Sequence, residues 1–297
     1  MRAQRVSSVM LCLLAVFGIA TAAEMNDVPV GIKAPVAQRD FTQREVMIPM
    51  RDGVKLRTLI FVPNGAKDAP LLMNRTPYDA VGRSTRNADS PTLLGTLPPN
   101  DEFYVKHGYI RVYQDVRGKY GSEGDYVMTR PLRGPLNATA VDHSTDAWDT
   151  IDWLVKNVAE SNGRVGMIGS SYEGFTVAMA LIDPHPALKV AVPQGPLLDG
   201  WMGDDWFHYG AFRNLMLGYA HMQTGQRGAG KITPSTTFDK YEEYLRAGST
   251  GDYIRANGLD KYPFVARLLA HPAYDAYWQN QALDRIIAAR PSRVPTL

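Results

Sequence analysis

The sequence VGMIGSSYEGFTVAMA, from Val165 to Ala180, places two serines between a short apolar strand and an apolar helix. In a strand–turn–helix elbow, a nucleophilic side chain occupies a strained position at the top of a sheet, and glycines lie where the strand and helix backbones crowd. The usual spacing has a glycine two residues before and two residues after the nucleophile. This pattern makes one of the two serines a candidate nucleophile.

Ser171 fits such an elbow better than Ser170. Gly169 lies two residues before Ser171, although Glu173 takes the second position after it and the next glycine comes one position later. A nucleophile at Ser170 would put the bulky Ile168 where the backbones crowd. We expect Ser171 to be the nucleophile and Ser170 to pack or hydrogen-bond locally. The alternative is that both serines only cap the helix.

Strands and helices alternate on both sides of this elbow. The predicted elements are a hairpin over 44–63, strands over 69–74, 109–114, 163–169 and 188–195, and helices over 101–108, 144–157 and 175–182. The hairpin turns at Asp52-Gly53, a dipeptide that tolerates positive φ. Ser144 or Thr145 is the candidate N-cap of the second helix. Alternating strands and helices predict an α/β fold with a mostly parallel sheet covered on both faces.

The pattern changes after residue 198. Residues 199–290 contain many aromatic side chains and few strand-like runs, which predicts a helical cap inserted over the sheet. Residues 24–198 are then the N-terminal part of the α/β core, and residues 291–297 are the start of a further core strand. We therefore expect the chain to stop before the sheet is complete.

Residues 1–23 have the composition of a secretory signal peptide. Two arginines precede an apolar stretch over residues 9–20, and Ala20-Thr21-Ala22 offers a small-residue cleavage site. The apolar stretch is too short to span a bilayer, and an uncleaved anchor is the alternative. The only cysteine, Cys12, lies in this segment, so the mature protein would have none. We expect a periplasmic or secreted bacterial protein without disulfides.

Composition restricts the kind of partner. The formal net charge of +2, without a run of lysines and arginines, gives no basic field for nucleic acid. We expect no cofactor and no metal, a small-molecule substrate, and no membrane contact after signal cleavage. The sequence is compatible with a homo-oligomer but does not predict one. Asp115, Arg117 and Glu123 are interpreted as a structural ion-pair and turn segment.

Several motifs together resemble one family. The motif GSSYEG, residues 169–174, resembles the Gly-x-Ser-Tyr-x-Gly elbow of the cocaine esterase / X-prolyl dipeptidyl peptidase (CocE/NonD) group of α/β-hydrolases. RDGVKLRTLIFVP, NRTPY, QDVRGKYGSEGDY and STDAWDTIDWL resemble the same group. Within it, DPHPALKVAVPQGPLLDGWMGDDWFHYGAFR, residues 183–213, resembles the α-amino-acid ester hydrolases, which hydrolyse and synthesise β-lactam antibiotics with an α-amino acyl chain. The resemblance implies an α/β-hydrolase fold and serine ester hydrolysis.

A serine ester hydrolase needs two donors for the oxyanion of the tetrahedral intermediate. The backbone N–H of Tyr172, directly after Ser171, is placed for one of them. The resemblance implies that the hydroxyl of Tyr78, in NRTPY, is the second. From the residues alone, a partly buried tyrosine packed beside Pro77 is the alternative.

The resemblance also implies a site for the substrate's α-ammonium group. That cation loses water on entering a pocket and needs a negative partner. Asp205, in WMGDDWFHYG, matches the ammonium-binding carboxylate. The alternative is that Asp204 and Asp205 cap a helix starting at Trp206, a role we expect of Asp204. Trp206 and Tyr209 are candidates for the wall of the acyl pocket or for aromatic core.

The remaining members of a triad are an acid and a histidine after the serine. The histidines after Ser171 are His185, His208, His221 and His271. None of them follows a predicted strand, and VPTL resembles the family's strand before the acid. We therefore expect the acid, the histidine and a C-terminal β-sandwich beyond residue 297, and this chain alone to be inactive.

These observations predict an exported serine hydrolase of α-amino-acid esters that works through an acyl-enzyme and hydrolyses or synthesises α-amino β-lactam antibiotics. Two alternatives stay open. One is a cocaine esterase-like or X-prolyl dipeptidyl peptidase-like hydrolase. The other is a catalytically inactive binding module that keeps the pocket without the triad.

Overall fold

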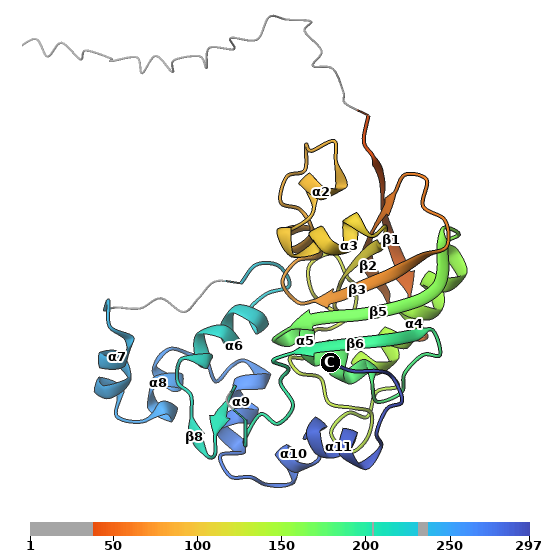
Figure 1. Ribbon diagram of the computed structural model, residues 1–297. Helices are drawn as coiled ribbons and strands as arrows, with labels where there is room; N and C mark the ends of the chain where they lie inside the picture. Colours follow the sequence, from red (N-terminus) through yellow and green to blue (C-terminus); the bar gives the residue numbers. More distant parts are fainter. Residues whose placement is uncertain (1–37, 204, 231–236) are drawn as a thin grey trace, which may run out of the picture. The chain divides into compact units, whose positions relative to one another are not determined.

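The computed structural model of the protein describes residues 38–203, 205–230 and 237–297 (Figure 1). The predicted signal peptide, residues 1–23, lies outside the described residues, as does Asp204. The strands are β1 (Phe41–Pro49), β2 (Lys55–Pro63), β3 (Ala69–Thr76), β4 (Ile110–Asp115), β5 (Ser161–Ser170), β6 (Leu188–Gln194), β7 (Phe207–His208) and β8 (Ala211–Phe212). The helices are α1 (Ala80–Ser84), α2 (Leu93–Thr96), the 3₁₀ turn η1 (Pro99–Asp101), α3 (Glu102–Lys106), α4 (His143–Asn157), α5 (Tyr172–Ala180), α6 (Met216–Thr224), α7 (Lys240–Ala247), α8 (Thr250–Ala256), α9 (Pro263–Ala270), α10 (Ala276–Gln279) and α11 (Leu283–Ala289).

The main sheet has six strands in the order β1-β2-β4-β3-β5-β6. β1 and β2 form the predicted antiparallel hairpin, with Gly53 at φ 84° in its turn. β2 is also antiparallel to β4, whereas β4, β3, β5 and β6 run parallel to one another. The predicted mostly parallel sheet is therefore confirmed. Because the carboxyl ends of neighbouring parallel strands meet at one edge, the loops after β3 and β5 lie close together.

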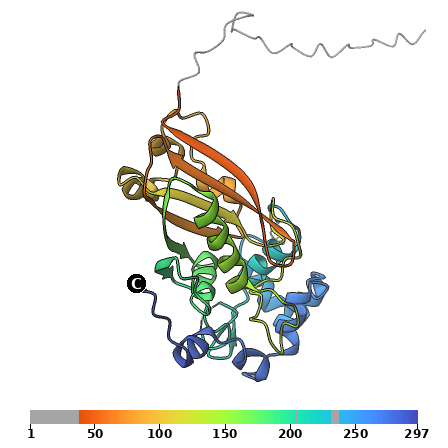
Figure 2. The same cartoon turned by 90° about the vertical axis from the view of Figure 1, so that its right-hand side faces the viewer.

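Helices cover both faces of this sheet. α4 and α5 lie on one face, where Ile151 and Val177 pack with apolar residues of the strands (Figure 2). On the other face, Leu93 and Leu97 of the α2 segment pack against Phe61 of β2. β3 and β4 are buried along almost their whole length, as expected for parallel strands covered on both sides.

The cap of α4 differs from the prediction. The helix begins at His143, and its N-cap is Asp142 rather than Ser144 or Thr145. Asp142 Oδ1 accepts the N–H groups of Ser144 at 2.8 Å and Thr145 at 3.0 Å, and the Thr145 hydroxyl accepts the N–H of Asp142 at 2.9 Å. This reciprocal capping box satisfies more backbone groups than a single serine cap would.

Between β6 and the last residues of the chain lie the β7–β8 hairpin and the helices α6 to α11, which we call the cap (Figure 1). Its apolar side chains form one cluster with α5: Trp206, Leu217 and Phe264 belong to the same cluster as Tyr172 and Phe175. The elbow helix therefore contributes to the sheet core on one side and to the cap core on the other.

The last described residues pair with β6. Ala191 donates its N–H to the carbonyl of Pro295 at 3.0 Å, and Leu297 donates to the carbonyl of Ala191 at 3.1 Å. The resulting bridge between Ala191 and Thr296 is parallel. Residues 295–297 thus lie beside β6 in the direction of the parallel strands.

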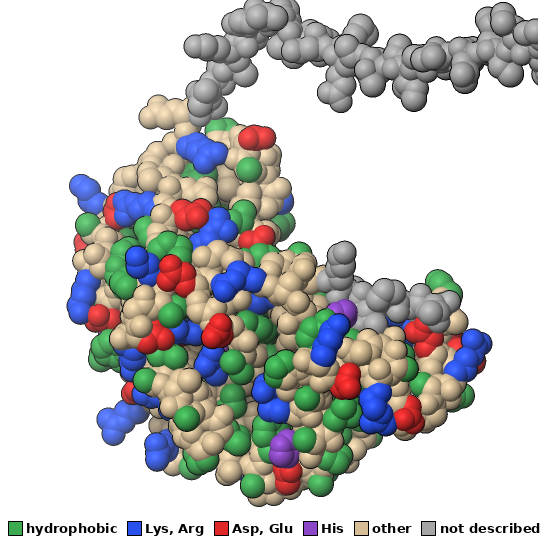
Figure 3. Space-filling view, turned by 180° about the vertical axis from the view of Figure 1, so that it is seen from behind, with side chains coloured by type: hydrophobic (Ala, Val, Ile, Leu, Met, Phe, Trp, Pro, Cys, Tyr) green, Lys and Arg blue, Asp and Glu red, His purple; other side chains and the backbone are tan. Residues whose placement is uncertain are grey.

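The surface shows no single dominant charge on the face drawn in Figure 3, where lysine and arginine side chains are interspersed with aspartate and glutamate. Within the described ranges, no helix is long and apolar enough to cross a membrane. The same residues contain no group of three or more His, Cys, Asp and Glu side chains arranged to hold a metal ion.

Candidate active site

Ser171 occupies the turn between β5 and α5. Its backbone has φ 61° and ψ −123°, an uncommon conformation for a residue with a side chain. Its N–H donates to the carbonyl of Gln194 at 3.0 Å, and its carbonyl accepts the N–H of Phe175 at 2.9 Å. The side chain is exposed. These features form the strained, solvent-facing turn expected for an elbow nucleophile.

Two glycines explain the shifted spacing of the motif. A Cβ atom on Gly169 would lie 2.5 Å from the carbonyl carbon of Glu173, and one on Gly174 would lie 2.6 Å from the carbonyl oxygen of Gln194. The close approach of helix to strand therefore falls at residue 174, where α5 crosses the end of β6. Residue 173 has room for a side chain, and Glu173 pairs there with Arg83, with Arg83 Nε 2.9 Å from Glu173 Oε1.

Ser170 differs from our expectation. It is the last residue of β5 and pairs with Gln194 of β6. Its side chain is exposed rather than packed, and it lines a polar cavity of about 380 Å³ together with Arg83, Asp101 and Glu173. A residue at the end of a strand and one in the following turn point in different directions, and Ser171 does not line this cavity.

Tyr172 places its backbone N–H at the start of α5. The first N–H groups of a helix have no acceptor within the helix and carry a partial positive charge, so this group can donate to an oxyanion. The side chain is buried, and its Oη accepts the N–H of Thr129 at 3.1 Å and lies 3.3 Å from Nε2 of His143. Burial raises the pKa of Tyr172 to about 12, so the phenol stays neutral.

His143 was missed from the sequence because it precedes Ser171, whereas a triad histidine follows the serine. It is buried at the start of α4, and its ring packs edge-on against Tyr172 and Phe175. Burial, together with the positive charge of Arg75, lowers the pKa of His143 well below its ordinary value. The imidazole is therefore neutral and supports the Tyr172 side chain.

Tyr78 lies in the loop after β3, the strand next to β5. Its N–H donates to the Thr76 hydroxyl at 3.0 Å, and the loop is tied to the end of β4 because Ala80 donates its N–H to Asp115 Oδ1 at 2.7 Å. The Tyr78 hydroxyl lies 2.9 Å from the hydroxyl of Tyr219 in α6. The structure thus brings Tyr78 to the sheet edge where Ser171 lies and connects it with the cap.

Asp205 lies in the cap, in the bend that leads into β7. It is half-buried, and its negative charge contributes, after burial and Tyr78, to a raised pKa of Tyr219. The neighbouring Trp206 stacks on Tyr219 with ring centroids 6.3 Å apart. The alternative of a helix starting at Trp206 is wrong, because bends lead from Asp205 into β7; the capping role expected of Asp204 concerns a residue outside the described ones.

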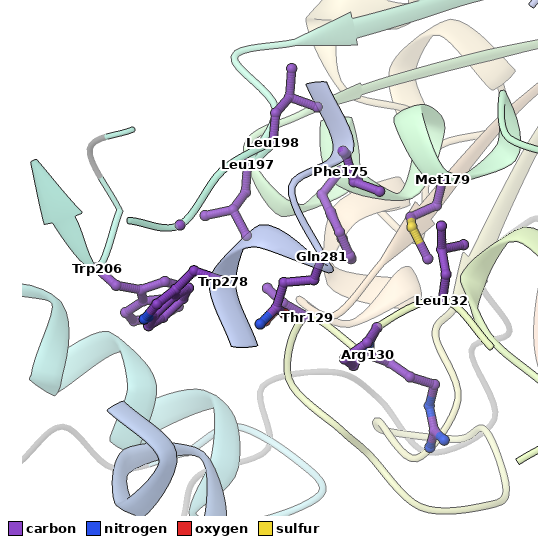
Figure 4. A pocket seen from close by; sticks show the side chains of 13 residues that line it. Thr129, Arg130, Leu132, Phe175, Met179, Leu197, Leu198, Trp206, Trp278 and Gln281 are labelled. Carbon is purple, nitrogen blue, oxygen red and sulfur yellow. The ribbon is translucent and has the colours of Figure 1, made fainter. Parts of the chain in front are cut away.

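The two aromatic candidates for the acyl pocket, Trp206 and Tyr209, differ in burial. Trp206 lines a cavity of about 20 Å³ together with Phe175 and Trp278 (Figure 4), which is room for about one water molecule. Ser171 is not among its lining residues. Tyr209 is 69% exposed and belongs to neither the cavity nor the cap core. Trp206 is therefore part of the cap core in this structure.

The histidines that follow Ser171 are engaged elsewhere. His185 lies 3.6 Å from Asp152, and the imidazole of His271 lies 2.6 Å from Asp275. His221 contacts the hydroxyl of Tyr262 at 3.0 Å, and His208 packs against the exposed Tyr209. None of these contacts involves Ser171.

Asp115, Arg117 and Glu123 have the structural roles expected of them. Arg117 pairs with Asp146 at 2.6 Å and Asp52 at 2.7 Å. Asp115 accepts backbone N–H groups through both carboxylate oxygens, and Glu123 accepts the N–H of Lys55 at 2.9 Å. The segment ties the hairpin, α4 and the Tyr78 loop together.

Comparisons with known proteins identify a family and several similar chains. A family model for X-Pro dipeptidyl-peptidase (S15 family) matches residues 52–297. Cocaine esterase of Rhodococcus sp. (strain MB1 Bresler) is 28% identical over 254 residues, which are 80% of this chain and 40% of the esterase. A solved α-amino acid ester hydrolase labelled with selenomethionine is 60% identical, with a TM-score of 0.86 over 93% of this chain and 45% of that one.

An aminopeptidase structure from a marine sediment archaeon, Thaumarchaeota archaeon, is 50% identical, with a TM-score of 0.84 over 92% of this chain and 45% of the aminopeptidase. The chain therefore spans less than half the length of each of these relatives. The two solved structures confirm the predicted α/β-hydrolase fold.

Proposed function

The chain belongs to the X-Pro dipeptidyl-peptidase (S15) family, and we propose that the whole protein is a serine hydrolase of α-amino-acid esters. One juxtaposition supports this function most strongly. Tyr78, at the sheet edge that holds Ser171, is hydrogen-bonded to Tyr219, and the ring of Tyr219 stacks on Trp206, the residue directly after Asp205. A donor for an oxyanion and the segment that carries a carboxylate for an ammonium group thus meet at Tyr219.

Ser171 is the nucleophile in this proposal. Its Oγ attacks the ester carbonyl carbon while a general base takes the hydroxyl proton, and the carbonyl oxygen becomes negative in the tetrahedral intermediate. The backbone N–H of Tyr172 and the hydroxyl of Tyr78 donate to that oxygen. The alcohol then leaves with a proton, and an acyl-enzyme remains. Water releases the acid, or an amine such as a β-lactam nucleus captures the acyl group to form an amide.

Asp205 supplies the selectivity for α-amino acyl groups. A substrate ammonium loses hydration when it enters a half-buried site, and a nearby carboxylate compensates for that loss. The 60% identity with a solved α-amino acid ester hydrolase supports this substrate class, including α-amino β-lactams. Cleavage of a peptide after its N-terminal residue is a second candidate, because the 50% identical aminopeptidase is named for substrates that also carry a free α-ammonium.

Labelling with a fluorophosphonate probe tests the nucleophile in the whole protein. Ser171→Ala should abolish labelling, because the probe reacts only with an activated serine hydroxyl. Ser170→Ala is the matched control and should be labelled at the wild-type rate. Labelling that survives in Ser171→Ala would remove the elbow assignment, and loss in both variants would point to damage of the turn rather than of a nucleophile.

A pair of substrates tests Asp205. Asp205→Asn should lower kcat/KM for a phenylglycine ester. The expected loss corresponds to about 2–4 kcal/mol of transition-state stabilisation, the range for leaving a charge without its partner in a desolvated pocket. The matched phenylacetate ester lacks the amine and should change little. Equal losses for both esters would show that Asp205 has a structural role. Comparing a phenylglycine ester with an N-terminal phenylglycyl amide separates esterase from aminopeptidase activity.

A further inference from the structure

A hydrogen bond between two phenols joins the sheet edge to the cap. The Tyr78 and Tyr219 hydroxyl oxygens lie 2.9 Å apart, although the two residues are separated by 141 positions. Tyr78 follows β3, and Tyr219 lies in the middle of α6. Each phenol has one proton, so only one of them can be the donor in this bond.

The direction of this bond follows from the role proposed for Tyr78. If Tyr78 donates its proton to the substrate's oxyanion, that proton is not available to Tyr219, and Tyr219 must donate to Tyr78. A hydroxyl that accepts a hydrogen bond becomes a stronger donor, and its rotation about the C–O bond is fixed. We infer that Tyr219 is a positioning residue that orients and polarises the Tyr78 hydroxyl, so that the cap completes the oxyanion site. This inference rests on the proposed function.

The surroundings of Tyr219 keep its proton in place. Trp206 stacks on its ring with an interplanar angle of 22°. Burial raises the pKa of Tyr219, and the hydrogen bond with Tyr78 and the negative charge of Asp205 raise it further. The phenol therefore stays protonated across the working pH range, which is the form that can donate.

The core holds the helix that carries Tyr219. Lys119 Nζ donates to the carbonyl oxygens of Gln223 at 3.0 Å and Gln226 at 3.1 Å, at the end of α6. Tyr120 donates its N–H to the carbonyl of Arg227 at 3.1 Å, and the Arg227 guanidinium donates back to the carbonyl of Gly124 at 3.0 Å. These contacts anchor α6 on the loop after β4, so the position of Tyr219 relative to Tyr78 is fixed from the core side.

A double-mutant cycle in the whole protein tests the inference. Tyr219→Phe keeps the ring and removes only the hydroxyl, and it should lower kcat for a phenylglycine ester about tenfold with KM nearly unchanged. It should weaken binding of the corresponding boronic acid, which forms a tetrahedral adduct on the serine, by the same factor. In a Tyr78→Phe background, the Tyr219→Phe substitution should cost nothing further, because its effect acts through Tyr78.

Tyr244→Phe is the matched control. Tyr244 is another cap tyrosine, and its hydroxyl donates to the carbonyl of Asn214 at 3.0 Å, away from Tyr78. This variant should stay within about twofold of the wild type, since its hydrogen bond serves the cap alone.

Three outcomes would overturn the inference. Wild-type kcat in Tyr219→Phe, together with a loss in Tyr78→Phe, leaves the proposed function intact and removes the role of Tyr219. If Tyr219→Phe lowers kcat by the same factor in the wild type and in Tyr78→Phe, Tyr219 has a structural role. A Tyr219→Phe variant that folds poorly would give this same result. A Tyr78→Phe variant with wild-type activity removes both the proposed oxyanion donor and the inference.

Discussion

Ser171 is held in an unfavourable backbone conformation by its neighbours. A non-glycine residue at positive φ of this kind costs about 1–3 kcal/mol and persists only where the surroundings determine it. Here the N–H of Ser171 is bonded to Gln194 of β6, and its carbonyl is bonded to Phe175 of α5. Glu173, in the first turn of α5, is buried and pairs with Arg83 of α1. Hydrogen bonds to β6 and α5, together with the Glu173–Arg83 ion pair beside the turn, thus hold the backbone of Ser171 in place.

Gly169→Ala should break this arrangement. The added Cβ would lie 2.5 Å from the Glu173 carbonyl carbon, and neither backbone segment can move away without distorting the turn. We expect the free energy of unfolding to fall by about 1–3 kcal/mol and fluorophosphonate labelling to be lost. Gly82→Ala is the control, because its Cβ would come no closer than 3.4 Å to another residue. A Gly169→Ala protein that is labelled like the wild type would contradict the role assigned to this glycine.

α6 links the core and the cap because its two functional parts face different partners. Tyr219 in its middle contacts Tyr78, and the carbonyl groups at its carboxyl end accept from Lys119. A buried ammonium at the end of a helix satisfies carbonyls that have no partner in the helix and interacts favourably with the helix dipole. Lys119 belongs to the QDVRGKYGSEGDY segment, so this segment also holds the carboxyl end of α6.

Lys119→Met should loosen this helix. Methionine has a similar length but no donor, which leaves buried carbonyls of Gln223 and its neighbours unsatisfied at a cost of about 1–3 kcal/mol. Hydrogen exchange followed by mass spectrometry should show faster exchange of the α6 amides, while β3 and β5 keep their protection. Lys106→Met, at an exposed pair with Glu102, should leave both regions unchanged. Uniform protection in Lys119→Met would show that packing alone holds α6.

Local features could be predicted from the sequence, whereas contacts between distant segments could not. The turn at Asp52-Gly53 and the alternation of strands and helices are set by neighbouring residues, and they were predicted. Asp142, rather than Ser144, caps α4 because several good capping residues lie within one turn, and only the surrounding hydrogen bonds select among them. The Tyr78–Tyr219 hydrogen bond joins two residues that lie 141 positions apart, and a tyrosine hydroxyl can bond with many other polar groups in the chain. The spacing of the elbow glycines is set by the contact between Gly174 of α5 and Gln194 of β6, which are separated by 20 positions.

The pH dependence of global stability includes a term from Asp115. Burial raises the pKa of this carboxyl to about 6 in the folded protein, from 3.8. Between these two pH values the folded protein binds more protons than the unfolded chain. The free energy of unfolding therefore falls as pH rises from about 4 to about 6, and above pH 6 it stays at the lower value. Asp115→Asn cannot titrate. The free energy of unfolding of the variant minus that of the wild type should therefore rise by about 1–3 kcal/mol between pH 4.5 and 7.5.

Urea unfolding at the two pH values measures this difference. Asn can accept only one of the two backbone N–H groups that Asp115 accepts, so the variant is expected to start from a deficit at low pH. The change with pH, rather than the absolute value, carries the prediction. A difference that stays constant or falls with rising pH would show that the carboxyl ionises as freely in the folded protein as in the unfolded chain.

The strand order has a consequence for the nascent chain on the ribosome. β1 and β2 can pair as soon as both have emerged, but β3 lies between β4 and β5, which are both made later. Until the chain has emerged as far as Ser170, at least one side of this strand, which is buried and apolar in the folded protein, has no partner. Unpaired strand edges recruit other chains. A nascent chain that has emerged beyond Thr76 but not yet to Ile110 therefore exposes β3 with both edges open, and chaperone capture is needed most at that stage.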